Sequence, residues 1–366
     1  MPTFDFDLFV LGGGSGGVRA ARTAAARGAR VALAEVAELG GTCVNVGCIP
    51  KKLYSYAAGY AESFEEAAGY GWQLDKPTFD WPQLKKQRAK EIHRLNAAYR
   101  SLLDGPGVTT LQGWGSLVDA HTIEVDGKHH TARHIIVATG GMPFVPAIVG
   151  SEHGLVSDQM FDLDPFPKRL VVVGGGYIAC EFASIFNGLG AKVTLLQRKS
   201  HILSDFDEDV RQFLAAEMKR SGIDIRFNCE IASIRSGSGG LDVMLERGTQ
   251  LQTDALLFAT GRRPNTQGFG LENAGVALDE HGAIVVDAHY RSSVPSIFAL
   301  GDVSTTLQLT PVALAEAMVV VDALFPDPKR PPSRRKVDYE YTPTAVFTHP
   351  NVGTCGYTEA GARRRF

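Results

Sequence analysis

Two cysteines lie near the beginning of the chain in a pattern that suits redox chemistry. Cys43 and Cys48 have four residues between them, at the start of a predicted helix. Residues five apart do not share a helix face, so the first helical turn must be distorted, and Gly47 would allow this. A helix N-terminus stabilises thiolates, which suits a redox-active pair. No second Cys/His pair stands at ligand spacing, which argues against zinc. A structural role for both cysteines is the alternative.

A glycine-rich turn precedes the cysteines. Gly12, Gly14 and Gly17 have the spacing G-x-G-x-x-G, and Glu35 follows 23 residues after Gly12. The first glycine permits a tight turn, the second lets the backbone approach a pyrophosphate, and the third lets a helix close on a strand. Glu35 would accept hydrogen bonds from a ribose 2′-hydroxyl, so the site suits an adenosine without a 2′-phosphate. The alternative is a glycine-rich loop without function.

A second turn has the variant G-x-G-x-x-A, from Gly174 to Ala179. Gln197 stands where an NAD site would have an acid, and Arg198 and Lys199 follow it. A carboxylate would repel a 2′-phosphate, whereas these two cations could bind one. This favours NADP as the second nucleotide. The alternative is that the two cations form a solvated loop.

These residues must be positioned by strands and helices that occur twice. Each copy consists of a predicted buried strand, a glycine turn, a helix and a second strand, and the two glycine turns lie 162 residues apart, at Gly12 and Gly174. The first copy is predicted as strand 7–11, helix 18–27 and strand 30–34; the second as strand 170–173, helix 181–189 and strand 192–196. Two such units imply two nucleotide-binding domains.

Further elements are predicted around and between the two units. Helices are expected at 51–66 and 81–103, and strands at 114–118, 121–125, 134–138, 255–259 and 296–300. Asp126-Gly127 predicts a hairpin turn. The proline-rich, basic stretch 327–336 predicts a linker.

Composition excludes several classes of protein. The 366 residues are 44% hydrophobic and 21% charged, which argues against global disorder. A net charge of −3 argues against a nucleic-acid binder, and no run of about 18 apolar residues indicates a membrane span. The first residues do not resemble a secretory signal, so a cytoplasmic location is expected. Five cysteines in a chain this long do not form a disulfide framework.

The sequence contains segment 43–52, both glycine turns, the Ala-Thr-Gly sequences at 138–140 and 259–261, and Gly301-Asp302. Together these features resemble the flavin-dependent pyridine nucleotide–disulfide oxidoreductases. The resemblance covers nearly the whole chain. It implies an α/β fold with two Rossmann-like dinucleotide-binding domains, for FAD and NADPH, and the start of an α+β dimerisation domain. The implied ranges are 1–150 and 288–338 for the FAD domain, 151–287 for the NADPH domain and 339–366 for the dimerisation domain.

The resemblance also implies roles for catalytic residues. Cys43 and Cys48 would form the redox disulfide, with Cys48 nearer the flavin and Cys43 attacking the substrate. Lys51 matches the lysine near the flavin ring, and Glu181 matches its ion-pair partner. Tyr177 matches the tyrosine that covers the flavin until the nicotinamide displaces it.

Other residues match cofactor-binding positions of the family. Asp302 matches the acid at the FAD ribityl or phosphate region, Thr310 the residue beside the pyrimidine end of the flavin, and Arg262 an arginine close to the flavin and nicotinamide. The predicted cofactor-binding residues are Gly12, Gly14, Ser15, Gly16, Gly17, Glu35, Thr42, Thr139, Gly140, Gly174, Gly176, Ile178, Arg198, Lys199, Gly261, Arg262, Asp302 and Thr310. No metal site is expected.

The implied substrate is glutathione disulfide, an anion whose carboxylates require a cationic site. Ser15, Arg22 and Tyr99 match substrate-contacting positions in the members that reduce it, and Arg19 adds a cation one turn before Arg22. The expected reaction is therefore NADPH-dependent reduction of glutathione disulfide. Members specific for trypanothione disulfide prefer a cationic substrate, and dihydrolipoamide-specific members would have an acid at Gln197. A reductase of another small disulfide is the alternative, and the two arginines could also form a solvated helix face.

The chain departs from the family pattern at three places. Met318 stands where animal-type members have an arginine, and Ser204 where some have a second phosphate-binding arginine, which leaves mixed use of NADPH and NADH open. Residues 341–359 resemble the first strands of the dimerisation domain. The resemblance implies about 100 further residues, among them the His–Glu pair that the partner subunit supplies, and these do not follow. Impaired homodimerisation and slow turnover are therefore expected; a truncated FAD- and NADPH-binding protein without turnover is the alternative. His349-Pro350 is not assigned the acid–base role.

Overall fold

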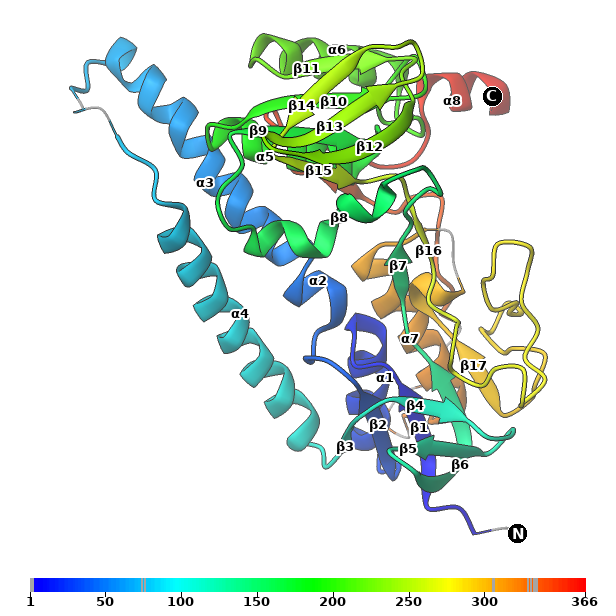
Figure 1. The fold of residues 1–366 in the computed structure, drawn as a ribbon. Coiled ribbons are helices and arrows are strands. Elements are labelled where there is room, and N and C mark those ends of the chain that lie inside the picture. Colours follow the sequence, from blue (N-terminus) through cyan, green and yellow to red (C-terminus); the bar gives the residue numbers. More distant parts are fainter. Residues whose placement is uncertain are drawn as a thin grey trace. The chain divides into compact units, whose positions relative to one another are not determined.

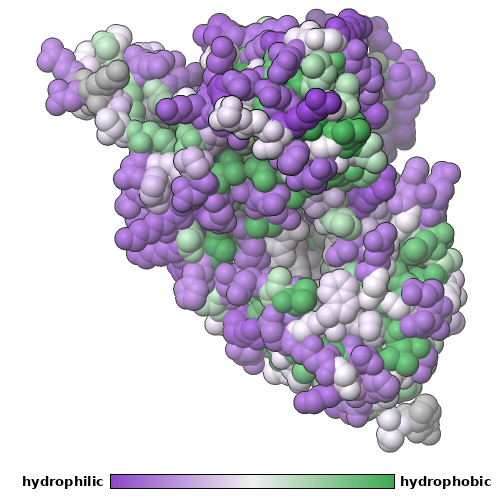
Figure 2. Space-filling model, in the orientation of Figure 1, coloured by the Kyte–Doolittle hydropathy of each residue, from purple (hydrophilic) through white to green (hydrophobic). Residues whose placement is uncertain are grey.

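The computed structural model describes residues 3–73, 75, 77–304, 307–327, 329, 331 and 335–366. The chain divides into two compact units, and Figure 1 labels most of their helices and strands. Unit 1 comprises Met1–Asn45, Glu91–Met142 and Arg262–Tyr339. Unit 2 comprises Val46–Lys90, Pro143–Gly261 and Glu340–Phe366. Hydrophilic residues predominate on the visible surface in Figure 2.

Unit 1 is built on a sheet with the strand order β3-β2-β1-β6-β5-β4, in which β17 also pairs with β6. Strands β3, β2, β1, β6 and β17 are parallel to their neighbours, and β4, β5 and β6 form antiparallel pairs. The strands are β1 (Phe6–Leu11), β2 (Val31–Glu35), β3 (Thr109–Gln112), β4 (Gly115–Leu117), β5 (Thr122–Val125), β6 (Lys128–Val137) and β17 (Ile297–Ala299).

Successive side chains of β1 point to opposite faces of this sheet, as in any pleated strand. Leu8 and Val10 pack in one core with residues of α1 (Ser15–Ala26) and α7 (Thr310–Leu324). Phe9 and Leu11 pack in another core with residues of β4, β5 and β6. The uninterrupted apolar run in β1 is therefore explained by a strand that is buried on both faces.

Unit 2 contains a fully parallel sheet in the order β11-β10-β9-β15-β8. Helices α3 (Cys48–Ala67), α5 (Tyr177–Gly188) and α6 (Glu208–Arg220) share one core with Leu170 and Val172 of β9. Val171 packs on the opposite face against the antiparallel sheet β12-β13-β14. The strands are β8 (Leu155–Val156), β9 (Arg169–Val173), β10 (Lys192–Gln197), β11 (Asp224–Phe227), β12 (Ile231–Gly237), β13 (Gly240–Leu245), β14 (Gln250–Thr253) and β15 (Ala255–Phe258).

Helix α4 (Trp81–Asp104) contributes residues to both units. Shorter elements make up the rest of the described secondary structure. They are the helices α2 (Gly41–Asn45) and α8 (Glu359–Arg365), the 3₁₀ turns η1 (Ala68–Tyr70), η2 (Ser151–His153), η3 (Ser157–Asp162) and η4 (Gly301–Val303), and the strand pairs β7 (Gly141–Pro143) with β16 (Arg262–Pro264) and β18 (Thr344–Val346) with β19 (Val352–Thr354). No described helix is long and apolar enough to cross a membrane.

The predicted α/β fold with two Rossmann-like sheets is confirmed. One local expectation is wrong: Cys43 and Cys48 do not share a helix with a distorted first turn. Helix α2 ends at Asn45, and Gly47 is the non-helical N-cap from which α3 begins at Cys48. The predicted domain ranges stay predictions. The predicted linker 327–336 lies partly outside the described residues.

Candidate active site

The carboxyl edge of the parallel strands in unit 1 brings together residues that are distant in the sequence. Strands β2, β1, β6 and β17 are successive neighbours. Strand β2 ends at Glu35, and β1 runs into the turn at Gly12. Strand β6 is followed by Thr139-Gly140, and β17 is followed by Gly301-Asp302. Ligands of doubly wound sheets bind outside the carboxyl ends of the strands. Four groups of residues predicted from the sequence therefore meet at the edge where a dinucleotide would bind.

The first glycine turn has the geometry of a phosphate-binding site. Gly12 has φ of 103°, and a Cβ there would collide with the carbonyl oxygen of Ala138. The nearest described atom to a Cβ on Gly14 would be 3.8 Å away, so this position is open. Helix α1 begins at Ser15, Gly16 and Gly17 and has neither a side-chain cap nor an acid in its first turn. Its first N–H groups can therefore bind an anion.

Glu35 is fixed beside that turn by two backbone donors. The N–H of Gly13 donates to Glu35 Oε2 at 2.7 Å, and the N–H of Ala37 donates to Oε1 at 2.8 Å. Each carboxylate oxygen keeps a lone pair for a further donor. The residue is therefore oriented as an acceptor for a ribose hydroxyl.

Asp302 and Arg262 lie close together at the same edge. Arg262 Nε is 4.0 Å from Asp302 Oδ2, and the Arg262 guanidinium also donates to the Gly141 carbonyl. Burial raises the pKa of Asp302, and Arg262 partly offsets this rise. Nearby, Asn265 accepts from Thr139 Oγ1 at 2.7 Å through its carbonyl and donates its N–H to Gly140. Thr310 begins helix α7.

A buried carboxylate that the sequence analysis did not single out supports the Gly301-Asp302 turn. Glu316 on α7 is fully buried, and its Oε2 accepts from the N–H of Gly301 at 2.6 Å. Its Oε1 accepts from Tyr339 Oη at 2.7 Å, and Tyr339 Oη lies 2.7 Å from Tyr290 Oη. Burial raises the pKa of Glu316, and the hydrogen bonds from Tyr339 and Gly301 oppose that rise.

Cys43 lies in α2, directly after Thr42. Two predicted substrate residues, Arg22 and Tyr99, belong to the same unit. Burial raises the pKa of the Tyr99 hydroxyl, Cys43 raises it further, and Arg22 opposes the rise. These three side chains are therefore close enough to influence one another electrostatically. A half-buried arginine and phenol beside a thiol suit an anionic disulfide.

Two asparagines that the sequence analysis missed hold the segment before Cys43. Asn45 Nδ2 donates to the carbonyls of Leu39 and Gly41, at 3.3 and 3.0 Å. Asn96 Nδ2 donates to the Leu39 carbonyl and to Asn45 Oδ1, both at 2.8 Å. The backbone that carries Cys43 is thus anchored to helix α4.

The glycine turn of unit 2 repeats the geometry of the first. Gly174 has φ of 127°, and a Cβ there would collide with the carbonyl oxygen of Ala259. No described atom lies within 4 Å of a Cβ position on Gly176. Helix α5, with Tyr177 and Ile178 first, has no side-chain cap and no acid in its first turn. Helix α6 differs, because Asp207 caps it and two acids follow, which would repel a phosphate.

The residues after β10 distinguish the two turns. Gln197 is buried, and its Nε2 donates to the His201 carbonyl at 3.0 Å. Arg198 and Lys199 are exposed, and Lys199 Nζ donates to Ser204 Oγ at 3.2 Å. Gly261 follows β15 at the same carboxyl edge. A 2′-phosphate would therefore meet cations here, with no carboxylate at the position of Gln197.

Lys51 and Glu181 form a buried ion pair in unit 2. Lys51 Nζ lies 2.6 Å from Glu181 Oε2, and the side chains are 8% and 2% exposed. Lys51 Nζ also lies 5.1 Å from the ring centroid of Tyr177. Burial lowers the pKa of Lys51, but Glu181, Tyr177 and Cys48 outweigh it, so the pKa of Lys51 lies above its ordinary value. A protonated lysine is thus held within electrostatic reach of the first residue of α3, Cys48.

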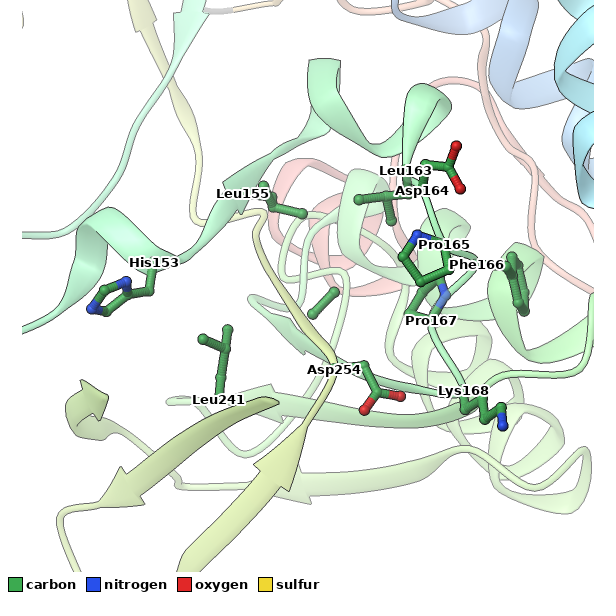
Figure 3. Close-up of a pocket in the computed structure, with 11 residues that line it drawn as sticks. His153, Leu155, Leu163, Asp164, Pro165, Phe166, Pro167, Lys168, Leu241 and Asp254 are labelled. Carbon is green, nitrogen blue, oxygen red and sulfur yellow. The ribbon is translucent and has the colours of Figure 1, made fainter. Parts of the chain in front are cut away.

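A pocket of about 490 Å³ lies elsewhere in unit 2 (Figure 3). Leu155 begins β8, and Lys168 and Asp254 immediately precede β9 and β15. The pocket therefore lies at the amino edge of the parallel sheet, opposite the Gly174 turn, and is separate from the nucleotide site. Among the described residues, no cluster of three or more histidines, cysteines or acids could hold a metal ion.

Comparisons with known proteins agree with this geometry. The family model of the pyridine nucleotide-disulphide oxidoreductases matches residues 6–317. The chain is 44% identical to a glutathione reductase of Burkholderia cepacia, over 100% of this chain and 80% of that protein. It is 42% identical to a chloroplastic/mitochondrial glutathione reductase of Pisum sativum, over 99% of this chain and 67% of that protein. The solved structure of the HOCl-induced flavoprotein disulfide reductase RclA from Escherichia coli has a TM-score of 0.88 and 31% identity, covering 98% of this chain and 79% of that one.

Proposed function

The chain belongs to the pyridine nucleotide-disulphide oxidoreductase family, and we propose that it is a flavoenzyme that reduces glutathione disulfide with NADPH. The observation that carries the proposal is the buried ion pair between Lys51, on the helix that begins with Cys48, and Glu181 on α5, together with the two uncapped N-termini of α1 and α5. The relatives at 44% and 42% identity that bear the name glutathione reductase support this substrate.

The residues present fit both cofactors. FAD would be held at the first turn by the backbone from Gly12 to Gly17, by Glu35 and by Asp302, and NADPH at the second turn by Gly174, Gly176 and the exposed Arg198 and Lys199. When bound, FAD supplies two-electron transfer between NADPH and the cysteine pair. The uncapped N-termini of α1 and α5 bind the phosphates in each case.

Cys43 and Cys48 exchange thiol for disulfide with the substrate. In the dithiol state, the Cys43 thiolate attacks one sulfur of glutathione disulfide, and one glutathione leaves with a proton. Cys48 then attacks Cys43 in the mixed disulfide, releases the second glutathione and restores the Cys43–Cys48 disulfide. Each turnover consumes one NADPH and one proton and produces two glutathione molecules.

Lys51 and Glu181 tune the charge around this exchange. Lys51 keeps its proton and offers positive charge to the Cys48 thiolate, and Glu181 keeps Lys51 protonated although it is buried. Tyr177 lies beside Lys51 at the beginning of α5. There it would cover the flavin until the nicotinamide displaces it. Arg22 and Tyr99, with Ser15 and Arg19, bind the carboxylates and backbone of the anionic substrate.

A steady-state comparison of disulfides tests the proposal. Purified protein loaded with FAD is assayed with NADPH and each of glutathione, lipoamide and trypanothione disulfides. A preference for glutathione disulfide by kcat/KM is expected because Arg22 and Arg19 favour an anionic substrate. Equal or better turnover of either competitor, or cofactor binding without disulfide reduction, would contradict it.

The cellular setting is also a proposal. We propose that the enzyme acts in the cytoplasm, since a dithiol that must be kept reduced suits a reducing compartment. A homodimer is the assembly that the family resemblance implies, and sedimentation of the purified chain measures it.

A further inference from the structure

The Glu181 carboxylate has a second partner besides Lys51. Its Oε2 pairs with Lys51 Nζ at 2.6 Å, and its Oε1 accepts the backbone N–H of Phe347 at 2.9 Å. Glu181 is 1% exposed, so water does not compete for either oxygen. Phe347 directly follows β18, 166 residues after Glu181 in the chain.

The peptide of Phe347 is itself held by helix α3. Ser55 Oγ donates to the Phe347 carbonyl at 3.3 Å, and Lys52 Nζ lies 4.6 Å from the centroid of the Phe347 ring. Lys52 Nζ also donates to Asn351 Oδ1 at 3.2 Å, and His349 Nε2 lies 3.1 Å from the Ser55 carbonyl oxygen. The N–H, carbonyl and ring of Phe347 are thus each engaged, which fixes the direction in which the N–H points.

We propose that Phe347 is a positioning residue of the redox site, whose backbone N–H locks the Glu181 carboxylate in the orientation that holds Lys51 protonated beside Cys48. The inference rests on the proposed function for its catalytic meaning. It differs from the ion pair itself, because the donor is a main-chain group that any residue except proline supplies.

Physical chemistry makes this donor important. A buried carboxylate whose second oxygen lacks a donor carries a large desolvation penalty and is free to turn toward another donor. A Glu181 carboxylate that turned away from Lys51 would no longer offset the burial of the lysine, which would then lose its proton at lower pH. The other titratable groups that face the pair are Tyr177 and Cys48 beside Lys51, and Cys180 beside Glu181.

Replacing the Phe347 amide by an ester tests the proposal, because phenyllactate at position 347 removes only the N–H. The same chain with phenylalanine at position 347, assembled in the same way, is the matched control, because it keeps both the N–H and the ring that contacts Lys52. In the FAD-loaded protein, the rate of flavin reduction by NADPH is measured against pH. The ester chain is expected to lose about tenfold in rate, the effect of one hydrogen bond to a charged group. The rate should also fall at high pH, where Lys51 loses its proton, and this fall should begin at lower pH in the ester chain. The fall should be absent in Lys51→Arg, because arginine does not titrate in that pH range.

A second readout does not depend on turnover. Alkylation of Cys48 by iodoacetamide is followed by peptide mass spectrometry in dithiothreitol-reduced protein, and the ester chain should require higher pH for half-maximal rate than the phenylalanine control. Equal behaviour of the two chains in both measurements would overturn the inference, even if wild-type protein reduces glutathione disulfide rapidly. If wild-type protein fails to reduce it, the proposed function is wrong, and alkylation still decides the inference.

Should the ester chain not fold, Ser55→Ala frees the Phe347 carbonyl; a smaller shift in the same direction supports the proposal, and no shift overturns it.

Discussion

Arg198 and Lys199 are the residues on which the choice between NADPH and NADH should depend, since both are exposed at the end of β10. Arg198→Glu should raise the KM for NADPH by tenfold or more, because a charged contact to phosphate contributes about 1.5–3 kcal/mol. The KM for NADH should change little. The exposed Arg235 in β12 provides the control Arg235→Glu, for which neither KM should change. A parallel rise for both cofactors in Arg198→Glu would show that Arg198 does not recognise the 2′-phosphate.

The two cysteines should differ in their spectra when either is replaced. Cys48→Ser should abolish the long-wavelength thiolate–flavin absorption of the NADPH-reduced protein, since Cys48 is the thiolate assigned to the flavin. Cys43→Ser should keep that band permanently, because Cys48 then has no disulfide partner. Visible absorption spectra of the two FAD-loaded variants measure this. The assignment of roles is wrong if Cys43→Ser lacks the band.

At the scale of elements, the sequence was sufficient wherever the signal is local. An uninterrupted apolar run such as Val171–Val173, followed by two glycines and an alanine at the spacing G-x-G-x-x-A, predicts a buried parallel strand and a phosphate-binding turn. Strand β9 and helix α5 have this arrangement. The break between α2 and α3 was not predictable in this way. It accompanies hydrogen bonds from Asn45 to the carbonyls of Leu39 and Gly41, and such bonds have no pattern in residue type.

The donors around buried carboxylates were missed for a related reason. The pairing of Lys51 with Glu181 came from a family resemblance, whereas the Phe347 N–H is a backbone group 166 residues from Glu181. Similarly, nothing in the sequence near Glu316 indicates that it accepts from Gly301 and Tyr339. Long-range contacts of main-chain groups depend on the whole fold, so neither composition nor periodicity predicts them.

The link from α7 to the Gly301 turn can be tested with Tyr339→Phe. This change leaves Glu316 Oε1 without its donor and should reduce the free energy of unfolding by about 1–3 kcal/mol. Burial already raises the pKa of Glu316, so its contribution to stability is present below the unfolded pKa and declines as pH rises through the folded pKa. Without the Tyr339 hydroxyl the pKa should rise further, and the loss should therefore be larger at pH 7 than at pH 4.

Urea unfolding at the two pH values measures this difference. Tyr70 is 83% exposed, and Tyr70→Phe should leave the free energy of unfolding unchanged at both. A loss in Tyr339→Phe that is the same at pH 4 and pH 7 would mean that Glu316 does not titrate in response to this hydroxyl.

At the scale of the whole molecule, the protein and its proposed ligands carry charge of the same sign. The chain has a formal net charge of −3 at pH 7, and both NADPH and glutathione disulfide are anions. The overall field therefore does not attract them, and attraction must come from local cations. Arg19 and Arg22 lie one turn apart on α1, and Arg19 Nε is buried without a hydrogen-bond partner among the described residues.

Salt should consequently weaken the reaction through these arginines. Raising ionic strength from ~0.02 to ~0.2 M shortens the Debye length to roughly 7 Å and should lower kcat/KM for glutathione disulfide severalfold. Arg22→Gln should lower kcat/KM by about tenfold at low salt, the loss of one charge-assisted contact, and should flatten the salt dependence. Arg94, which is exposed and paired with Glu91, provides the control Arg94→Gln, whose salt dependence should match the wild type. If Arg22→Gln keeps the wild-type slope, the attraction of the disulfide arises elsewhere on the molecule, and Arg22 does not recognise its carboxylates.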